Sequence, residues 1–120
     1  MERSKKKILI ADDDPGILDV LTLLLEEDGY EVETTDDGAT IGEFQNGYPD
    51  LMLLDIWLSG WNGRDICRAL KIREDTKHLP IILISANNET EKIAQEAGAD
   101  DFLAKPFNLD EVLEKIERLL

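Results

Sequence analysis

Four apolar runs, each followed directly by a polar residue, constrain the fold of this 120-residue chain more than any other feature. The runs are residues 8–11, 51–54, 80–84 and 102–104. The residues that follow them are Asp12, Asp55, Ser85 and Lys105. Short, fully apolar runs are typical of strands buried on both faces of a parallel sheet. Because parallel strands end at one edge, we expect these polar side chains to meet where open α/β sheets build their sites.

Helical patterns lie between the apolar runs. Asp14 and Pro15 suit the cap and first turn of a helix, and its buried stripe is predicted to be Ile17, Val20, Leu21 and Leu24. A weaker helix is expected over about residues 38–46, a third around Cys67 and a fourth over roughly Glu89–Ala97. The last helix follows Asn108, with a predicted stripe of Leu109, Val112, Leu113, Ile116 and Leu120. Strands alternating with helices predict a single α/β domain over residues 1–120 with a parallel sheet.

Charge and composition exclude several classes of partner. With 13 basic and 27 acidic residues the net charge is −14, so we expect no direct binding of nucleic acid by this domain. No apolar run approaches the ~20 residues that span a bilayer, and no secretory leader is visible, so we expect a cytoplasmic protein without membrane contact. The single cysteine, Cys67, fits a reducing compartment and is predicted to be a small core residue.

The polar residues at the predicted sheet edge indicate a chemistry before any family is considered. Three consecutive carboxylates, residues 12–14, follow the first run, although one would suffice to begin a helix. Together with Asp55 they form an oxygen-rich set of the kind that Mg²⁺ prefers. A hydroxyl from Ser85 and the charge of Lys105 would suit a phosphoryl group. The sequence therefore predicts a site for a divalent metal and a phosphoryl group.

Four motifs in this order and spacing resemble those of the receiver domain of two-component response regulators, the CheY-like family. They are the acidic pair Asp12–Asp13, the isolated Asp55, the pair Ser85–Ala86 and the pair Lys105–Pro106. The resemblance covers the chain from Ile8 to the last helix. It implies a doubly wound (βα)5 sandwich whose five-stranded parallel sheet has the flavodoxin-like order 2-1-3-4-5.

The resemblance also implies a role for each site residue. Asp55 would be the phosphoacceptor, receiving the group from a phosphohistidine of a sensor histidine kinase or histidine phosphotransfer protein. Lys105 and Ser85 would contact the phosphoryl oxygens. Mg²⁺, or Mn²⁺, would be held by Asp12, Asp13, Asp55 and the backbone carbonyl of Trp57. Such a module catalyses only its own phosphorylation and dephosphorylation.

A conformational switch is the second implication. Ser85 would move toward the phosphoryl group and Phe102 would swing into the space behind it. The output face would comprise the fourth helix, the fifth strand and the fifth helix, and would signal to an output domain or form a homodimer. Candidates for salt bridges across that dimer are Lys92, Asp101 and Lys115.

The loop after Asp55 departs from the family pattern. Receivers commonly have proline four residues after the acceptor, where this chain has Ser59, and Trp57 and Trp61 are unusually bulky there. One tryptophan is expected to be anchored in the fold and the other to be exposed for a partner. We predict that Trp57 restricts water and slows dephosphorylation. Asn87 is a second candidate for orienting that water.

Two alternatives come from other classes. A haloacid-dehalogenase-like phosphatase would use the aspartate ending the first strand as its nucleophile, and Asp12 with Asp14 has the required spacing. The chain lacks that class's cap domain and later acidic pair. A receiver-like module that binds without phosphorylation is the other alternative, and the intact acidic and basic positions argue against it.

Overall fold

In the computed structural model, which describes residues 5–86 and 90–120, five parallel strands form one sheet of order β2-β1-β3-β6-β7. The strands are β1 (Lys7–Ala11), β2 (Glu31–Thr35), β3 (Leu51–Asp55), β6 (Ile81–Ser85) and β7 (Asp101–Ala104). A separate hairpin, β4 (Trp57–Leu58) with β5 (Trp61–Asn62), follows β3. In sheet strands alone the order is 2-1-3-4-5, which confirms the predicted fold class.

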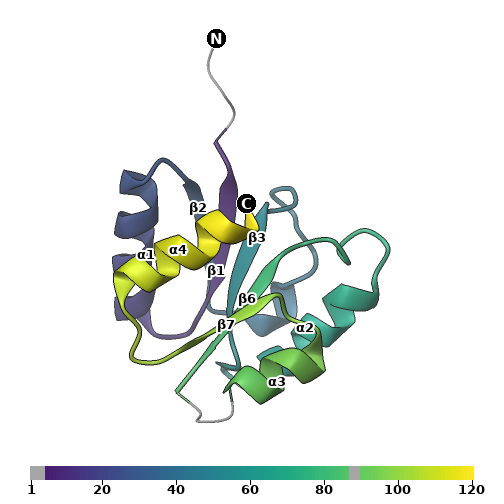
Figure 1. The fold of residues 1–120 in the computed structure, drawn as a ribbon. Helices are drawn as coiled ribbons and strands as arrows, with labels where there is room; N and C mark the ends of the chain where they lie inside the picture. The colour runs from purple at the N-terminus through teal and green to yellow at the C-terminus, as the bar shows by residue number, and fades with distance from the viewer. Residues whose placement is uncertain (1–4, 87–89) are drawn as a thin grey trace.

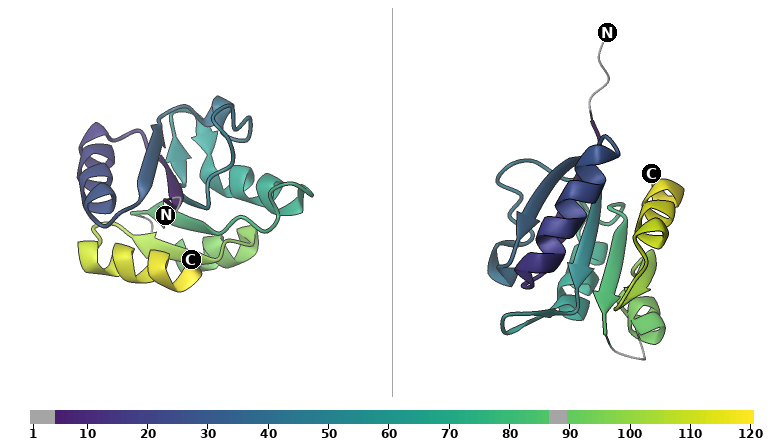
Figure 2. Two further views of the ribbon diagram at one scale, coloured as in Figure 1. Left: turned by 90° about the horizontal axis from the view of Figure 1, so that it is seen from above. Right: turned by 90° about the vertical axis from the view of Figure 1, so that its left-hand side faces the viewer.

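Helices cover both faces of the sheet (Figures 1 and 2). They are α1 (Pro15–Glu27), α2 (Gly63–Ile72), α3 (Thr90–Ala97) and α4 (Leu109–Leu119). Alternate residues of the buried strands supply two cores, because successive side chains of a strand point to opposite faces. Ile8 and Ile10 of β1 pack with α1 and α4, whereas Leu9 and Ala11 pack with α2 and α3. In the described residues, no helix has the length and apolar character needed to cross a membrane.

The first and last helices begin as predicted but bury different residues. The Asp14 carboxylate accepts the Gly16 N–H at 2.9 Å, and Pro15 is the first residue of α1. In α1, Leu21 and Leu25 are fully buried, whereas Val20 is 49% exposed. In α4, Val112 and Ile116 are buried, but Leu109 is 40% exposed, and Leu120, which follows the helix, is 42% exposed. Both helices have more apolar residues than the sheet can cover, so packing decides which are buried.

The expected helix over residues 38–46 is wrong. Only one 3-10 turn, η1 (Gly38–Thr40), forms, and the chain then turns without helical structure. Gly42, Phe44 and Gly47 have φ angles of +103°, +48° and +91°, in the left-handed region that an α-helix excludes. Ile41 and Phe44 nevertheless pack against the core. An irregular segment therefore covers the sheet where the sequence predicted a helix.

Candidate functional site

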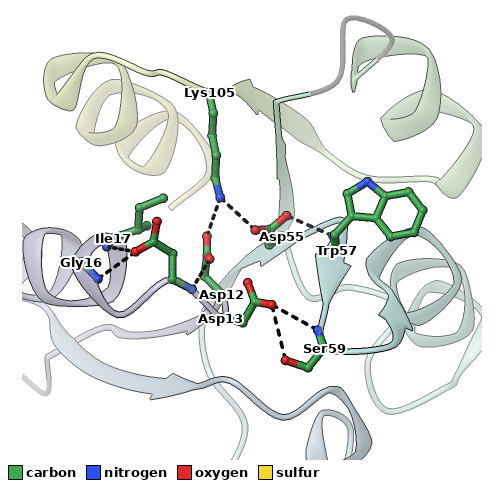
Figure 3. Close-up of polar contacts among 9 residues, drawn as sticks. Asp12, Asp13, Gly16, Ile17, Asp55, Trp57, Ser59 and Lys105 are labelled. Atoms are coloured by element: carbon green, nitrogen blue, oxygen red, sulfur yellow. Dashed lines mark hydrogen bonds and ion pairs between the residues drawn. The ribbon is translucent and has the colours of Figure 1, made fainter.

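The sheet brings the predicted site residues to its carboxyl edge (Figure 3). Ala11 of β1 is in register with Leu54 of β3, so Asp12 and Asp55 are the next residues on neighbouring strands. Ser85 of β6 is in register with Ala104 of β7, and Lys105 is the residue after Ala104. A cavity of about 450 Å³ at this edge is lined by Asp13, Asp55, Trp57, Ser85, Ala86 and Lys105.

Three carboxylates form the acidic part of the site. Asp12, Asp13 and Asp55 each offer an oxygen, and these oxygens lie within 4.8 Å of one another. Asp12 is fully buried, Asp55 is 5% exposed and Asp13 is exposed. Burial raises the pKa of Asp12, and repulsion by Asp55 adds to the rise, while the Asp14 N–H opposes it. The folded protein therefore holds a concentration of negative charge that attracts a cation.

Lys105 is the cation that the chain itself supplies. Its Nζ donates to Asp55 Oδ2 at 2.9 Å and lies 3.1 Å from Asp12 Oδ2. Burial opposes protonation of Lys105, but its hydrogen bond to Asp55 and its charge contacts with both carboxylates dominate and raise its pKa. Lys105 is therefore fully charged at neutral pH, and one lysine is shared between two carboxylates.

The environment of Asp12 fits a bound metal ion. Its Oδ1 accepts the Asp14 N–H at 2.9 Å. Its buried Oδ2 forms an ion pair with Lys105 but, among the described residues, accepts no well-aligned hydrogen bond. A buried carboxylate oxygen without a full set of donors has room for a ligand bond. With three oxygen donors together, the set suits a hard cation such as Mg²⁺.

The hairpin after β3 contributes contacts that the sequence did not predict. The Trp57 N–H donates to Asp55 Oδ1 at 3.0 Å, opposite the oxygen that faces Lys105. The N–H and hydroxyl of Ser59 lie 3.3 and 3.4 Å from Asp13 Oδ2. Both tryptophan side chains are exposed, Trp57 at 62% and Trp61 at 47%. Trp61 also lies so close to Gly38 that a Cβ there would collide with its side chain.

The predicted switch residues lie on neighbouring strands, Ser85 buried on β6 and Phe102 partly buried on β7. Lys115 Nζ lies 5.1 Å from the centre of the Phe102 ring and 2.9 Å from Asp101 Oδ1. Two of the three candidates for bridges across a dimer, Asp101 and Lys115, therefore pair within one chain. Lys92 is exposed on α3.

Two further predictions concern single residues. Cys67 is fully buried, and burial raises the pKa of its thiol to about 11, so it is a core residue and not a nucleophile. Asn87 lies outside the described residues.

Comparison with known proteins gives one consistent family. The model of the response regulator receiver domain matches residues 8–117. The DNA-binding response regulator MtrA of Mycolicibacterium smegmatis is 35% identical over 123 residues, covering 100% of this chain and 53% of MtrA. The chain spans about half the length of the curated relatives it matches.

Solved structures agree over nearly the whole chain. The response regulator TrrA of Thermotoga maritima, in complex with Mg²⁺-BeF, has a TM-score of 0.82 and 35% identity, covering 96% of this chain and 99% of TrrA. A CheY-like receiver domain protein of Methanospirillum hungatei has a TM-score of 0.82 and 36% identity, covering 97% and 94% of the two chains.

Proposed function

The chain belongs to the response regulator receiver family, as its motifs predicted, and we propose that it is switched by phosphorylation of Asp55. One observation carries this proposal. The two oxygens of Asp55 accept hydrogen bonds from Lys105 on one side and from the Trp57 N–H on the other. A carboxylate held in this way beside Asp12 and Asp13 is oriented as a nucleophile, while its neighbours supply places for a metal ion.

The reaction would be a phosphoryl transfer in which the residues mainly position and neutralise charge. A carboxylate oxygen of Asp55 forms a bond to phosphorus as the phosphorus–nitrogen bond of a phosphohistidine breaks. The imidazole leaves with the electron pair of that bond and takes up a proton. Lys105 already contacts Asp55 Oδ2, so its ammonium group is next to the incoming phosphoryl oxygens. Ser85 lines the same cavity and would donate a hydrogen bond to one of them.

Asp12, Asp13 and Asp55 would hold Mg²⁺ at this site, with the Trp57 carbonyl as a further ligand. The bound ion would supply positive charge to the phosphoryl oxygens as a Lewis acid. Three clustered carboxylates and the incompletely satisfied Asp12 Oδ2 support this assignment. The complex of TrrA with Mg²⁺-BeF supports it from a relative of similar fold.

A groove beside the site is a candidate for docking the phosphodonor. It has a volume of about 750 Å³ and is lined by Ile17 and Val20 of α1 and by Pro106, Phe107 and Leu109 beyond Lys105. Val20 and Leu109, both predicted to be buried, are exposed at this groove. An apolar groove next to Lys105 suits an amphipathic helix that carries a phosphohistidine, from a histidine kinase or phosphotransfer protein.

The signal would leave through the face formed by α3, β7 and α4. These elements correspond to the fourth helix, the fifth strand and the fifth helix of the predicted fold. Phosphorylation must favour one of two conformations to act as a switch. Ser85 and Phe102 lie on adjacent strands that join the site to this face. A second copy, or an output domain in a longer protein of the kind represented by the curated relatives, would bind there.

The experiment that tests this proposal is intact mass spectrometry after incubation with a small-molecule phosphodonor. We expect one phosphoryl group per chain with Mg²⁺ and none after chelation. The Asp55→Asn variant should remain unmodified under both conditions. Equal labelling of the wild type and Asp55→Asn would reject Asp55 as the acceptor. A wild type that takes no label from any donor would favour the phosphorylation-independent binding module.

A further inference from the structure

The β4–β5 hairpin contacts two of the three site carboxylates through adjacent donors. The Trp57 N–H donates to Asp55, and two residues later the N–H and hydroxyl of Ser59 reach Asp13 Oδ2 (Figure 3). Among the described residues, Ser59 is the only donor to the Asp13 carboxylate. Asp13 is exposed, so the surrounding core does not hold its side chain as it holds Asp12.

The base of the hairpin is packed tightly against the end of β3. The Gly63 N–H donates to the Ile56 carbonyl at 2.6 Å, and a Cβ at Gly63 would collide with the backbone carbonyl of Asp55. Ser59 and Gly60 form the turn with positive φ angles of +23° and +87°. This backbone leaves the N–H and hydroxyl of Ser59 facing Asp13. Ser59 and Asp55 therefore lie on one continuous segment whose base is closely packed.

We propose that Ser59 is a positioning residue for Asp13 that prepares the carboxylate to bind Mg²⁺, an inference that rests on the metal site proposed above. The two donors of Ser59 occupy Asp13 Oδ2 and leave Oδ1 for a cation. Without them, repulsion from Asp12 and Asp55 would turn an exposed carboxylate toward water. Mg²⁺ requires near-ideal octahedral geometry, whereas Ca²⁺ tolerates irregular sites. The orientation of Asp13 should therefore affect the binding of Mg²⁺ more than the binding of Ca²⁺.

Calorimetric titration of the unphosphorylated protein with MgCl₂ and with CaCl₂ tests this role. Removing a residue that orients a metal ligand typically weakens binding about 10–100-fold. Because the Ser59 N–H remains in Ser59→Ala, we expect its Mg²⁺ dissociation constant to rise by a smaller factor, about three- to tenfold. The Ca²⁺ constant should change less. Thr40→Ala, which removes another exposed hydroxyl, should leave the Mg²⁺ dissociation constant unchanged.

Each other outcome contradicts the inference in a distinguishable way. A wild type that does not bind Mg²⁺ would overturn both the metal site and the role of Ser59. Wild-type binding with an equal dissociation constant in Ser59→Ala would overturn the role of Ser59 alone and leave the proposed function intact. If Ser59→Ala binds Mg²⁺ more weakly and its metal-free unfolding free energy has also fallen, Ser59 has a structural role.

Discussion

Replacing Asp12 by asparagine should stabilise the metal-free protein, although Asp12 lies at the centre of the site. Asparagine has nearly the same shape, and its Oδ1 can still accept the Asp14 N–H, a bond of 2.9 Å in the wild type. The substitution removes a fully buried negative charge. The amide N–H₂ takes the place of Oδ2 and cannot accept from Lys105, which keeps its hydrogen bond to Asp55 Oδ2. Burial, with repulsion from Asp55, raises the pKa of Asp12, so the charged form is disfavoured in the folded state.

The magnitude follows from Coulomb's law with an effective dielectric constant of about 20. At 3.1 Å, the attraction of Asp12 to Lys105 is about 5 kcal/mol. Repulsion by Asp55, within 4.8 Å, is at least about 3.5 kcal/mol, and the exposed Asp13 adds a screened repulsion. Attraction and repulsion nearly cancel, so the cost of burying the carboxylate decides the sign. We expect Asp12→Asn to raise the unfolding free energy by about 1–2 kcal/mol.

The pH dependence of this gain has a definite sign. The unfolded pKa of Asp12 is near 3.8 and the folded pKa is higher, so the folded state binds more protons between the two values. Wild-type stability from this group is therefore present at low pH and is lost as the pH rises through that window. The advantage of Asp12→Asn should be full at pH 7 and should shrink on acidification.

Urea unfolding in EDTA at pH 7 measures the difference directly. Asp19→Asn, an exposed carboxylate on α1, is the matched control and should leave the unfolding free energy nearly unchanged. Mg²⁺ should stabilise the wild type more than Asp12→Asn, because the stabilisation by a ligand rises with the logarithm of its concentration relative to its dissociation constant. A metal-free Asp12→Asn less stable than the wild type by 1 kcal/mol or more would refute the reasoning.

Three other substitutions test separate parts of the account. Lys105→Met should lower the rate of phosphorylation from a small-molecule donor by at least about tenfold, measured by intact mass, because it removes the cation beside Asp55; an unchanged rate would exclude that role. Trp57→Ser should speed loss of the phosphoryl group, followed after donor removal, because a bulky side chain no longer restricts water; equal or slower loss would contradict this. Val20→Asp should slow phosphoryl transfer from a phosphorylated histidine kinase, because the kinase is proposed to dock in the groove that Val20 lines. Transfer from a small-molecule donor, which does not need the groove, should be unchanged; equal slowing with both donors would argue against docking there.

The buried strands and the site edge were predictable because a short-range pattern determines them. Each apolar run fills both faces of the sheet, and the residue after it must lie at the carboxyl edge. This strand pattern alone places Asp12, Asp55 and Lys105 together, and the structure agrees.

Features that depend on tertiary packing were not predictable in the same way. The apolar residues of α1 are more numerous than those that the helix buries against the sheet. The local sequence therefore does not distinguish Val20, which is exposed, from Leu25, which is buried. The left-handed backbone at Phe44 replaces a helix that the pattern of apolar residues favoured. Ser59 and Asp13 are 46 residues apart, and their contact depends on a hairpin without a clear sequence signal. The serine in place of a proline and the two tryptophans showed that this loop departs from the family pattern, but they did not indicate its contact with Asp13.

The most direct test of the central claim is to locate the phosphoryl group. The protein is phosphorylated with Mg²⁺ and a small-molecule donor, reduced with borohydride, digested and mapped by mass spectrometry. We predict one reduced residue, Asp55. Modification at Asp12 would contradict this account and favour the phosphatase mechanism, in which the aspartate after the first strand is the nucleophile.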